Sequence, residues 1–405
     1  MEVPLINNRD FIIFGLQPWD ISIGSNCKNI ADEIAKNNRV MYVNRPLDRI
    51  SMYKNKNTIQ AKNRLVSIRE GKNVLNAISK QLWIFNPRVV LESINFLPPG
   101  SIYNYLNKRN NKKLANEIKW ACHELGFNDP ILLIDDDFFN GLYLKEFLNP
   151  ALFIYYIRDF LLSQKYFVRH GYRSEPLLIK KADAVATNSK YLAGYASKYN
   201  SNTADIGQGC DVEEFLTSPS SLPADTNGIN YPIIGYCGSL TATRLDIDLI
   251  YFIAAQKPEW NIVLVGPEDD SFKVSSLHTL SNVHFLGPKR TDQLPAYTHA
   301  FDVCINPQLL NQMTIGNYPR KVDEYLAAGK PVVATKTEAM EMFVEQVFLC
   351  NNKEEYIGKI QEALLEAKIE NKIRTRKKLA KSHTWAASVN LLYQLIIKTY
   401  KEHAK

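Results

Sequence analysis

The sequence predicts an α/β protein of two doubly wound domains, each a parallel sheet with helices on both faces. Short apolar segments alternate with amphipathic helical patterns along most of the chain, as in strand, helix, strand units. The alternation stops at residues 217–232, a stretch rich in Ser, Pro, Asp and Gly, and then starts again. The length of 405 residues exceeds one ordinary core and fits two domains.

The first domain opens with a strand, helix, strand unit and continues with further strands. In order, we expect the strand DFIIFGL, the helix CKNIADEIAKNN, the strands RVMYVN, DPILLID and ALFIYYIRD, and a strand and helix within KKADAVATNSKYLAGYASKYN. Asn188 or Ser189 is suited to cap that helix. We interpret residues 217–232 as a linker or a long surface loop.

The second domain repeats the alternation. In order, we expect the strand IIGYCGS, the helix LDIDLIYFIAAQKP, the strands NIVLVGP and VHFLGP, the helix LPAYTHA and the strand DVCINP. In NYPRKVDEYLAAGKPVVAT, Pro319 suits a first helical turn, Gly329 a left-handed cap and Pro331 the entry into a buried strand. The final helix is expected to pack back on the first domain. We therefore place the first domain at 1–205 with 386–405, and the second at 206–385.

Composition excludes several classes of protein. A hydrophobic content of 45% excludes a disordered chain, and neither a membrane span nor a signal peptide is recognisable. The six cysteines form no CxxC pair and the seven histidines form no ligand-spaced cluster, so we expect reduced thiols and no metal. We expect a cytoplasmic protein.

Positive charge is concentrated in one region. Residues 45–120 contain 15 Lys and Arg but only 4 Asp and Glu, while the whole chain carries a net charge of +7. This region suits an anionic membrane surface, a phosphorylated acceptor or nucleic acid, and an ordinary solvated surface explains it equally well. No nucleic-acid-binding motif accompanies it, so we do not expect a nucleic acid partner.

Several residues at predicted strand ends and helix starts can bind an anionic ligand. Gly238, Gly266 and Gly287 follow strands, where glycine lets the backbone approach a phosphate or a base, although sharp turns also need glycine. On the helix after Pro319, Lys321 and Glu324 share one face with a ring, Tyr325. An exposed helix acid paired with Lys321 is the alternative for Glu324, and we expect Tyr325, Leu326 and Ala328 to serve helix packing and not ligand contacts.

Together, GYCGSLTATR, VLVGP, NVHFLGPK and PRKVDEYLAAGKPVV resemble, in this order, the nucleotide-sugar half of the GT-B glycosyltransferases of the retaining family 4. The first half adds GLQPWDISIGSNCKNIA, RVMYVNRPLDR, YYIRDFLLSQKYFVRHG and IGQGCDVEEF. The resemblance covers nearly the whole chain and is to a bacterial branch of surface-polysaccharide and teichuronic-acid-type biosynthesis. It implies two Rossmann-like domains facing a central cleft, and a glycosyltransferase that moves a sugar from a nucleotide donor to a glycan or lipid-linked acceptor at the inner membrane face.

The resemblance also implies roles for individual residues of the second domain. Glu324 matches the second glutamate of the family's E-x7-E signature, which accepts hydrogen bonds from the ribose hydroxyls, and Lys321 and Arg244 match cations that meet the diphosphate. Two fixed cations and a helix N-terminus can stabilise the leaving group without a metal. The other donor-binding residues expected are Gly238, Ser239, Gly266, Leu286, Gly287, Thr314 and Asn317.

One position departs from the signature. Gly316 stands where the first glutamate of E-x7-E is expected, so the carboxylate that usually addresses the transferred sugar is absent. Asn317, Thr314 or Asn311 can take that contact, and the departure also admits a non-catalytic binding protein.

The acceptor side is expected in the first domain. Asp20 and Gly24 lie in the first strand-to-helix loop, where family members meet the acceptor or the diphosphate. Asp159, at a strand end, is a catalytic candidate and His170 an acceptor-side one, although strand-end acids are often helix caps. In a retaining reaction the donor phosphate itself can take the proton.

Two other enzyme classes stay open at this point. Asp135 to Asp137 resemble the Asp-x-Asp metal site of GT-A glycosyltransferases, but the rest of the chain lacks that pattern. A GT-B nucleotide-sugar epimerase would use the same donor motif without an acceptor.

Overall fold

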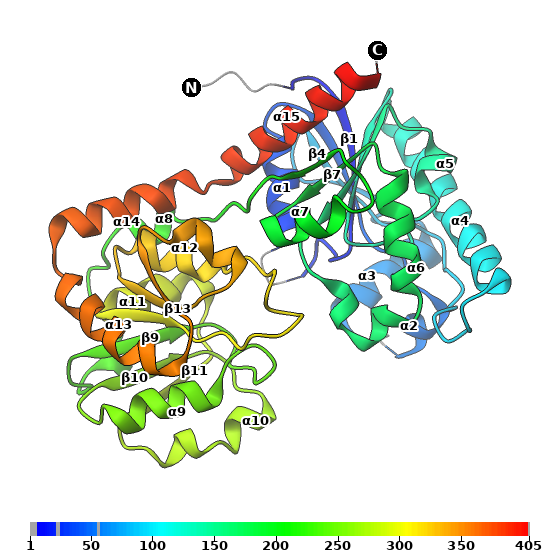
Figure 1. Cartoon of the computed structure of the whole chain (residues 1–405). Coiled ribbons are helices and arrows are strands. Elements are labelled where there is room, and N and C mark those ends of the chain that lie inside the picture. Colours follow the sequence, from blue (N-terminus) through cyan, green and yellow to red (C-terminus); the bar gives the residue numbers. More distant parts are fainter. Residues whose placement is uncertain (1–5, 22–24, 55–56, 404–405) are drawn as a thin grey trace. The chain divides into compact units, whose positions relative to one another are not determined.

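The computed structural model describes residues 6–21, 25–54 and 57–403. They form two compact units, unit 1 at Met1–Gly207 with Ser388–Lys405, and unit 2 at Gln208–Ala387 (Figure 1). The chain therefore crosses between the units after Gly207 and after Ala387, within two residues of the positions expected from the sequence.

Unit 1 is built on an eight-stranded sheet in the order β3-β4-β2-β1-β5-β6-β7-β8. All neighbouring strands pair in parallel except β3 with β4. Its helices and strands are β1 (Asp10–Gly15), α1 (Asn26–Ile34), β2 (Arg39–Val43), α2 (Arg49–Lys54), α3 (Ile59–Glu70), β3 (Leu75–Ala77), β4 (Leu82–Phe85), α4 (Ser101–Leu125), β5 (Ile131–Asp135), α5 (Leu144–Leu148), β6 (Leu152–Ile157), α6 (Lys165–Lys181), β7 (Ala184–Thr187), α7 (Lys190–Ala196), β8 (Thr203–Asp205) and α15 (Trp385–His403), which enters the unit at Ser388.

Helices cover both faces of this sheet because its strands are apolar on both sides. In β1, Ile12 and Phe14 join a core that includes Leu114 and Ile118 of α4. On the opposite face, Phe11 lies 6.5 Å from the ring of Tyr393 in α15, measured between ring centroids. The doubly wound arrangement predicted from the sequence is therefore confirmed, and Ser189 rather than Asn188 caps α7.

The last helix, α15, is attached to unit 1 by buried polar contacts as well as by apolar packing, as predicted. The side-chain amide of Asn38 donates to the hydroxyl of Tyr393 at 2.9 Å, and that of Asn202 donates to Thr399 at 2.9 Å. Asn38 also donates to the Ile6 carbonyl at 3.1 Å and accepts from the Arg9 amide at 3.1 Å. One buried asparagine thus joins the start and the end of the chain.

Unit 2 is built on a six-stranded parallel sheet in the order β11-β10-β9-β12-β13-β14. One face packs under α11 and α12, with Val322 and Leu326, and the other under α9 and α13, with Ile250 and Ile360. Its helices and strands are α8 (Glu213–Leu216), β9 (Ile233–Cys237), α9 (Ile247–Gln256), β10 (Asn261–Val265), α10 (Asp270–Lys273), β11 (Val283–Gly287), α11 (Leu294–Ala300), β12 (Val303–Asn306), α12 (Arg320–Ala327), β13 (Val332–Thr335), β14 (Val347–Cys350), α13 (Lys353–Glu366) and α14 (Glu370–Ser382).

Residues 217–232 belong to unit 2 and do not join the units, so the linker interpretation is wrong and the surface-loop interpretation is correct. Asp225 attaches this loop to unit 2, because its carboxylate accepts from Lys289 at 2.6 Å and from the hydroxyl of Tyr297 at 2.8 Å. Ser and Pro mark an irregular backbone, but they do not indicate whether that backbone is tethered.

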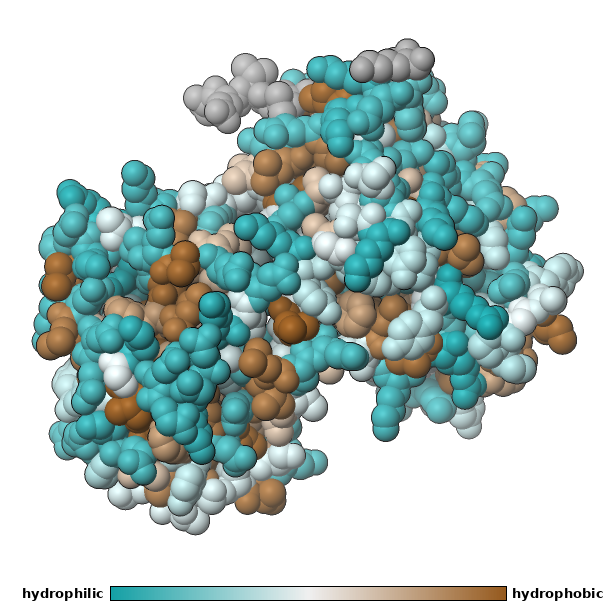
Figure 2. All heavy atoms as spheres, in the orientation of Figure 1, coloured by the Kyte–Doolittle hydropathy of each residue, from teal (hydrophilic) through white to brown (hydrophobic). Residues whose placement is uncertain are grey.

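On the face drawn in Figure 2, hydrophilic residues predominate and apolar residues form small separate groups. Within the described ranges, none of the helices combines the length and apolar character that crossing a bilayer requires.

Glu175 of α6 is a buried acid that joins three elements of unit 1. Its carboxyl group accepts from the hydroxyl of Tyr155 in β6 at 3.2 Å and from that of Tyr195 in α7 at 3.0 Å. The side chain is 1% exposed. Burial raises the pKa of Glu175 from 4.5 to about 7, and the two tyrosine hydrogen bonds oppose that rise.

We predict that Glu175 makes stability depend on pH. The folded state holds a proton that the unfolded state releases, so this contribution is complete below about pH 4.5 and is lost as the pH rises through about 7. Glu175→Gln should therefore gain about 2–3 kcal/mol relative to wild type between pH 5 and pH 8. Melting temperatures across this range test the prediction, with the exposed Glu124→Gln as a control, and a pH-independent difference would contradict it.

Candidate functional site

The candidate site of unit 2 lies where three neighbouring parallel strands end in glycine. Gly238 follows β9, Gly266 follows β10 and Gly287 ends β11. The Gly238 amide donates to the Val265 carbonyl at 2.8 Å, and the Gly266 amide donates to the Gly287 carbonyl at 3.0 Å. The three predicted glycines are therefore brought together in one row at the carboxyl edge of the sheet.

Close backbone packing requires glycine at Gly266. A Cβ atom there would stand 1.9 Å from the carbonyl oxygen of Gly238, and φ is +152°, which residues with a side chain rarely adopt. At Gly287 the φ of +69° favours glycine, but the space around it is open. A ligand can therefore approach the backbone at this edge. At Gly266, however, the close packing against Gly238 is by itself enough to require glycine.

Helix α12 is fixed over this edge by Tyr325. The Tyr325 hydroxyl accepts from the Cys237 amide at 2.8 Å and donates to the Cys237 carbonyl at 3.2 Å. Tyr325 and Leu326 are fully buried, which confirms that they serve helix packing. The C-terminal end of β9 and the functional face of α12 are thus joined by one side chain.

Lys321 extends from α12 to the glycine edge. Its amine donates to the hydroxyl of Tyr236 in β9 and lies 4.2 Å from the centroid of that ring. A Cβ atom at Gly238 would stand 3.0 Å from the same amine. This partner is a phenol and not a carboxylate, so no ion pair with it occupies the lysine at the edge.

Glu324 is neither exposed nor paired with Lys321. Its side chain is 15% exposed and accepts from Arg320 at 3.2 Å, one helical turn away. Burial raises the pKa of Glu324, and Arg320 and Lys321 act in the opposite direction. The alternative reading of a solvated acid paired with Lys321 is therefore not supported.

Asp323, on the other side of α12, ties the helix to the end of unit 2. Its carboxylate accepts from the hydroxyl of Tyr318 at 2.6 Å and lies 2.7 Å from Nδ1 of His383. The carbonyl of His383 in turn accepts from the Cys210 amide at 2.9 Å. This contact holds α12 to both crossing segments of the chain.

Two loops meet beside the site. Arg244 is exposed, its carbonyl accepts from the Leu309 amide at 2.8 Å, and no side chain of the described residues pairs with its guanidinium. Thr314 is fully buried, and its hydroxyl is bonded to the Leu309 carbonyl and to Asn311 within the loop. Asn317 is half-buried and follows Gly316, which is buried.

The remaining donor-side predictions lie at the same edge. Ser239 is exposed next to Gly238, and its carbonyl accepts from the Tyr236 hydroxyl at 3.4 Å. Leu286 is half-buried and packs on the core under α11 and α12.

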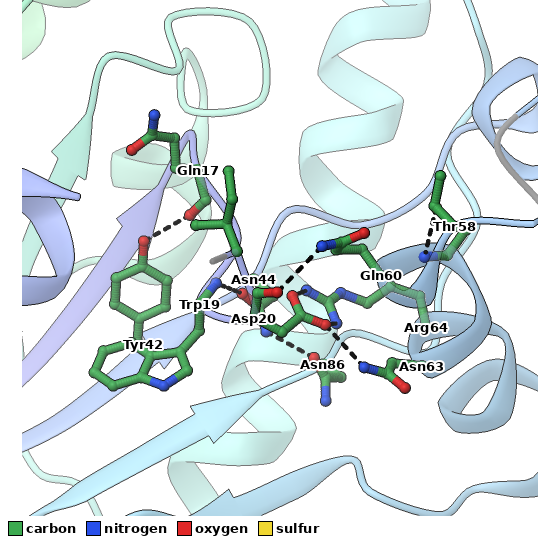
Figure 3. A network of polar contacts seen from close by, with 12 residues as sticks. Gln17, Trp19, Asp20, Tyr42, Asn44, Thr58, Gln60, Asn63, Arg64 and Asn86 are labelled. Atoms are coloured by element: carbon green, nitrogen blue, oxygen red, sulfur yellow. Dashed lines mark hydrogen bonds and ion pairs between the residues drawn. The ribbon is translucent and has the colours of Figure 1, made fainter. Parts of the chain in front are cut away.

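In unit 1, Asp20 is the centre of a polar network (Figure 3). Its carboxylate forms an ion pair with Arg64 at 2.8 Å and accepts from Asn63 at 3.0 Å. Gln60 donates to its carbonyl at 3.1 Å, so three residues of α3 hold the loop after β1. Burial alone raises the pKa of Asp20, but the hydrogen bonds from Arg64 and Asn63 outweigh it and the pKa lies below its ordinary value.

An open cavity of about 330 Å³ adjoins this network. Its lining consists of Trp19, Asp20, Asn44, Asn63, Arg64, Asn73, Asn76, Ile84 and Asn86. The Trp19 amide donates to Asn44 at 2.7 Å, and Asn44 donates to Asn86 at 2.8 Å, which continues the network across the ends of β2 and β4. We name this space the asparagine cavity.

Asp159 belongs to a separate cluster, after β6. It accepts from Arg158 at 2.6 Å, and Arg158 also donates to Asp135 at 2.9 Å. The Asp159 amide donates to Asp136 at 3.2 Å. Asp136 accepts from backbone amides and Asp159 from the guanidinium of Arg158, whereas the second carboxylate oxygen of Asp135 is buried without a partner. No group of three or more potential metal ligands occurs in the described part of the chain.

His170 lies in α6 and is 2% exposed. Its ring stacks on Tyr103 with 3.6 Å between centroids, and Nε2 lies 3.2 Å from the Asn95 carbonyl oxygen. Burial lowers the pKa of His170. Gly24 lies outside the described residues. Asp20, Asp159 and His170 take part in three separate sets of contacts among the described residues.

Comparison with known proteins places these units in a class. Anabaena HepE in complex with UDP is 17% identical, with a TM-score of 0.66 over 97% of this chain and 100% of that chain. Its complex with UDP-glucose has a TM-score of 0.64 at 18% identity over 96% and 99%. Sucrose-phosphate synthase from Thermosynechococcus elongatus is 16% identical, with a TM-score of 0.67 over 98% and 100%. The class is the GT-B fold, as the sequence predicts.

Sequence comparison also finds glycosyltransferases. Residues 231–366, which lie within unit 2, match the family described as glycosyl transferases group 1. The chain is also similar to the protein named "Putative teichuronic acid biosynthesis glycosyltransferase TuaH" of Bacillus subtilis (strain 168), with 27% identity over 256 residues. That match spans 60% of this chain and 62% of the relative. The predicted glycosyltransferase resemblance is confirmed at this level.

We predict that replacing glycine by alanine destabilises the protein more at Gly266 than at Gly287. Gly266→Ala should lower the free energy of unfolding by more than about 3 kcal/mol, because its Cβ would collide with the Gly238 carbonyl. Gly287→Ala is the matched control and should cost only about 1–2 kcal/mol of left-handed strain. Unfolding midpoints measure both, and equal losses would show that the close approach at Gly266 has been misassigned.

Proposed function

We propose that the protein transfers a sugar from a nucleotide diphosphate donor to a glycan or lipid-linked acceptor in cell-surface polysaccharide biosynthesis. The observation that carries this proposal is the glycine edge of unit 2, over which α12 holds Lys321 and Glu324. The group 1 domain and the likeness to TuaH support the same reaction class and setting.

The donor is proposed to lie on this edge with its diphosphate between Lys321 and Arg244. Neither cation forms an ion pair with a carboxylate of the described residues, so both can neutralise a diphosphate without first breaking an ion pair. Glu324 accepts from the ribose hydroxyls, and the base lies at Leu286 and Gly287 on β11. Because HepE is described with UDP and with UDP-glucose, uracil is the base to test first.

The reaction is proposed to be retaining and to need neither a metal nor another cofactor. The bond between the anomeric carbon and the diphosphate oxygen breaks, and the acceptor oxygen bonds to that carbon while its proton passes to the leaving phosphate. Lys321 and Arg244 stabilise the charge that develops on the leaving group. Asp159, with its carboxylate bound to Arg158, then orients the acceptor and need not act as a base.

The transferred sugar lacks a carboxylate partner, because Gly316 stands at the position where a glutamate would supply it. Asn317 is the substitute that the geometry favours, because it is half-buried while Thr314 is bonded within its loop. The acceptor is proposed to enter unit 1 at the asparagine cavity, next to Asp20.

A membrane surface is proposed as a second partner, through α4. Ile102 and Tyr105 are 71% and 68% exposed, and Arg109 and Lys112 continue the same helical face. Lys108 and Lys113, in contrast, are already paired with Glu146 and Glu92 at 3.4 and 3.3 Å. Rings near unpaired cations suit an anionic lipid surface at the inner face of the membrane.

The loss of the first glutamate favours one alternative, a binding protein without turnover. A nucleotide-sugar epimerase is the other, and it would bind the donor with no acceptor. Donor binding without release of sugar onto an acceptor or water would support the first, and inversion at C2 of the sugar the second.

We predict that one class of UDP-, GDP-, ADP- or dTDP-sugars raises the melting temperature of the protein in EDTA. Glu324→Ala should lose this shift, which corresponds to at least about a tenfold weaker affinity, because the ribose hydroxyls lose a charged acceptor. The exposed Glu341→Ala serves as the control and should keep it. A shift that appears only with added metal would contradict metal independence, and a shift unchanged in Glu324→Ala would contradict the site.

We predict that binding to acidic liposomes depends on Arg109 and Lys112. Reversing both charges, Arg109→Glu with Lys112→Glu, should weaken co-sedimentation with anionic vesicles more than about tenfold, since each cation contributes about 1 kcal/mol at such a surface. The matched control reverses Lys378 and Lys381 of α14, which are also exposed and one turn apart. Equal binding by both double variants would remove the membrane partner from the proposal.

A further inference from the structure

The contact between Lys321 and Tyr236 spans the carboxyl edge of the sheet in unit 2. Helix α12, which carries Lys321, covers one face of that sheet, and the ring of Tyr236 belongs to the core on the opposite face, under α9 and α13 (Figure 1). The Lys321 amine therefore reaches over the end of β9 to donate to the Tyr236 hydroxyl. Gly238 lies at this point, since a Cβ atom there would stand 3.0 Å from both the amine and the hydroxyl.

The donor and the acceptor in this contact follow from the chemistry of the two groups. An ammonium group can only donate, so the Tyr236 oxygen accepts from Lys321. The phenol proton is then directed to the Ser239 carbonyl, which lies 3.4 Å from the hydroxyl. Tyr236 is 2% exposed, so its ring has little room to turn away. The phenol thus joins the lysine to the turn that follows β9.

Lys321 keeps two of its three N–H donors for a ligand. Tyr236 takes one of them, and no acceptor among the described residues takes the others. The lysine is half-buried and not enclosed, so a ligand at the glycine edge can reach its amine. A mobile lysine side chain loses rotamer entropy when it binds an anion, whereas one that is already held in place loses less.

A purely structural role does not explain this contact, because another side chain already attaches α12 to β9. The Tyr325 hydroxyl forms two hydrogen bonds with the backbone of Cys237, at 2.8 and 3.2 Å, and no charged group takes part in them. A second connection through a charged amine adds little to the attachment of the helix. What it adds is a fixed position for the positive charge.

We propose that Tyr236 is a positioning residue, whose hydroxyl holds the Lys321 ammonium over Gly238 so that the ammonium binds the diphosphate of the donor. The inference rests on the proposed function, in which the diphosphate lies between Lys321 and Arg244. The bonds of the hydroxyl run to Lys321 and Ser239, and not to the residues assigned to the ribose and the base. The hydroxyl should therefore matter for a nucleoside diphosphate and not for a nucleoside.

The test compares UDP with uridine on the full chain, by titration calorimetry for UDP and by saturation-transfer NMR titration for uridine. Tyr236→Phe keeps the ring and removes the hydroxyl, and it should weaken UDP binding at least about fivefold while uridine binding stays unchanged. If GDP, ADP or dTDP binds the wild type more tightly than UDP, that nucleotide and its nucleoside replace the pair. The control is Tyr356→Phe, which removes a buried hydroxyl 2.8 Å from that of Thr335 and should bind both ligands as the wild type does.

A double-mutant cycle separates positioning from a structural effect. Lys321→Ala should weaken UDP binding at least about tenfold, and adding Tyr236→Phe should weaken it no further, because the hydroxyl then has no amine to hold. Equal losses from Tyr236→Phe with and without Lys321 would overturn the proposal. Equal losses for UDP and uridine, unchanged UDP binding, or failure of Tyr236→Phe to fold would overturn it as well.

The same measurements distinguish this inference from the proposed function. If no nucleoside diphosphate binds the wild type, or if Lys321→Ala binds UDP as the wild type does, the proposed donor site is overturned and the inference with it. If Lys321→Ala loses UDP affinity and Tyr236→Phe does not, the inference alone fails.

Discussion

Parallel pairing of the strands is the constraint on which both units depend. With helices returning over both faces, the strands must be apolar on both sides, and every parallel strand of a unit ends at one edge. Side chains such as Phe11, Ile12, Ile13 and Phe14 of β1 are buried to 0–1% exposure and have no room for chemistry. Polar groups with a function can therefore gather at the carboxyl edge, in the loops and at the starts of the helices that follow the strands.

The carboxyl edges of the two units differ in whether their charged side chains form ion pairs within the unit. In unit 1, Arg158 is buried among Asp135, Asp136 and Asp159, and Arg64 is bound to Asp20, so most charges at that edge are neutralised within the unit. In unit 2, the counterpart of Lys321 is a neutral ring, and Arg244 has no carboxylate partner among the described residues. Cations without an internal ion pair suit a diphosphate, because the ligand then supplies the opposite charge.

The sequence predicts the architecture and the residues of the glycine edge because both depend on local patterns. Apolar runs mark β1, β9 and β10, and the spacing of Lys321, Glu324 and Tyr325 marks one helical face. The short strands β3, β4, β8 and β14 escape prediction, since three or four residues carry little periodicity. Tyr236, Asp323 and Arg64 are also missed, because their roles depend on partners 85, 60 and 44 positions away along the chain.

Deeply buried polar side chains of unit 1 are explained by the hydrogen bonds that they form. Asn38 and Asn110 are buried with their amide groups bonded, and Asp20 is held by three residues of α3. Asn107 is also buried, and its side-chain nitrogen has no partner among the described residues, which costs the folded protein about 1–3 kcal/mol. Its side-chain oxygen, however, accepts from the buried amide of Asn111 at 3.2 Å. Because that oxygen satisfies a buried donor, Asn107 belongs with the asparagines that build the fold.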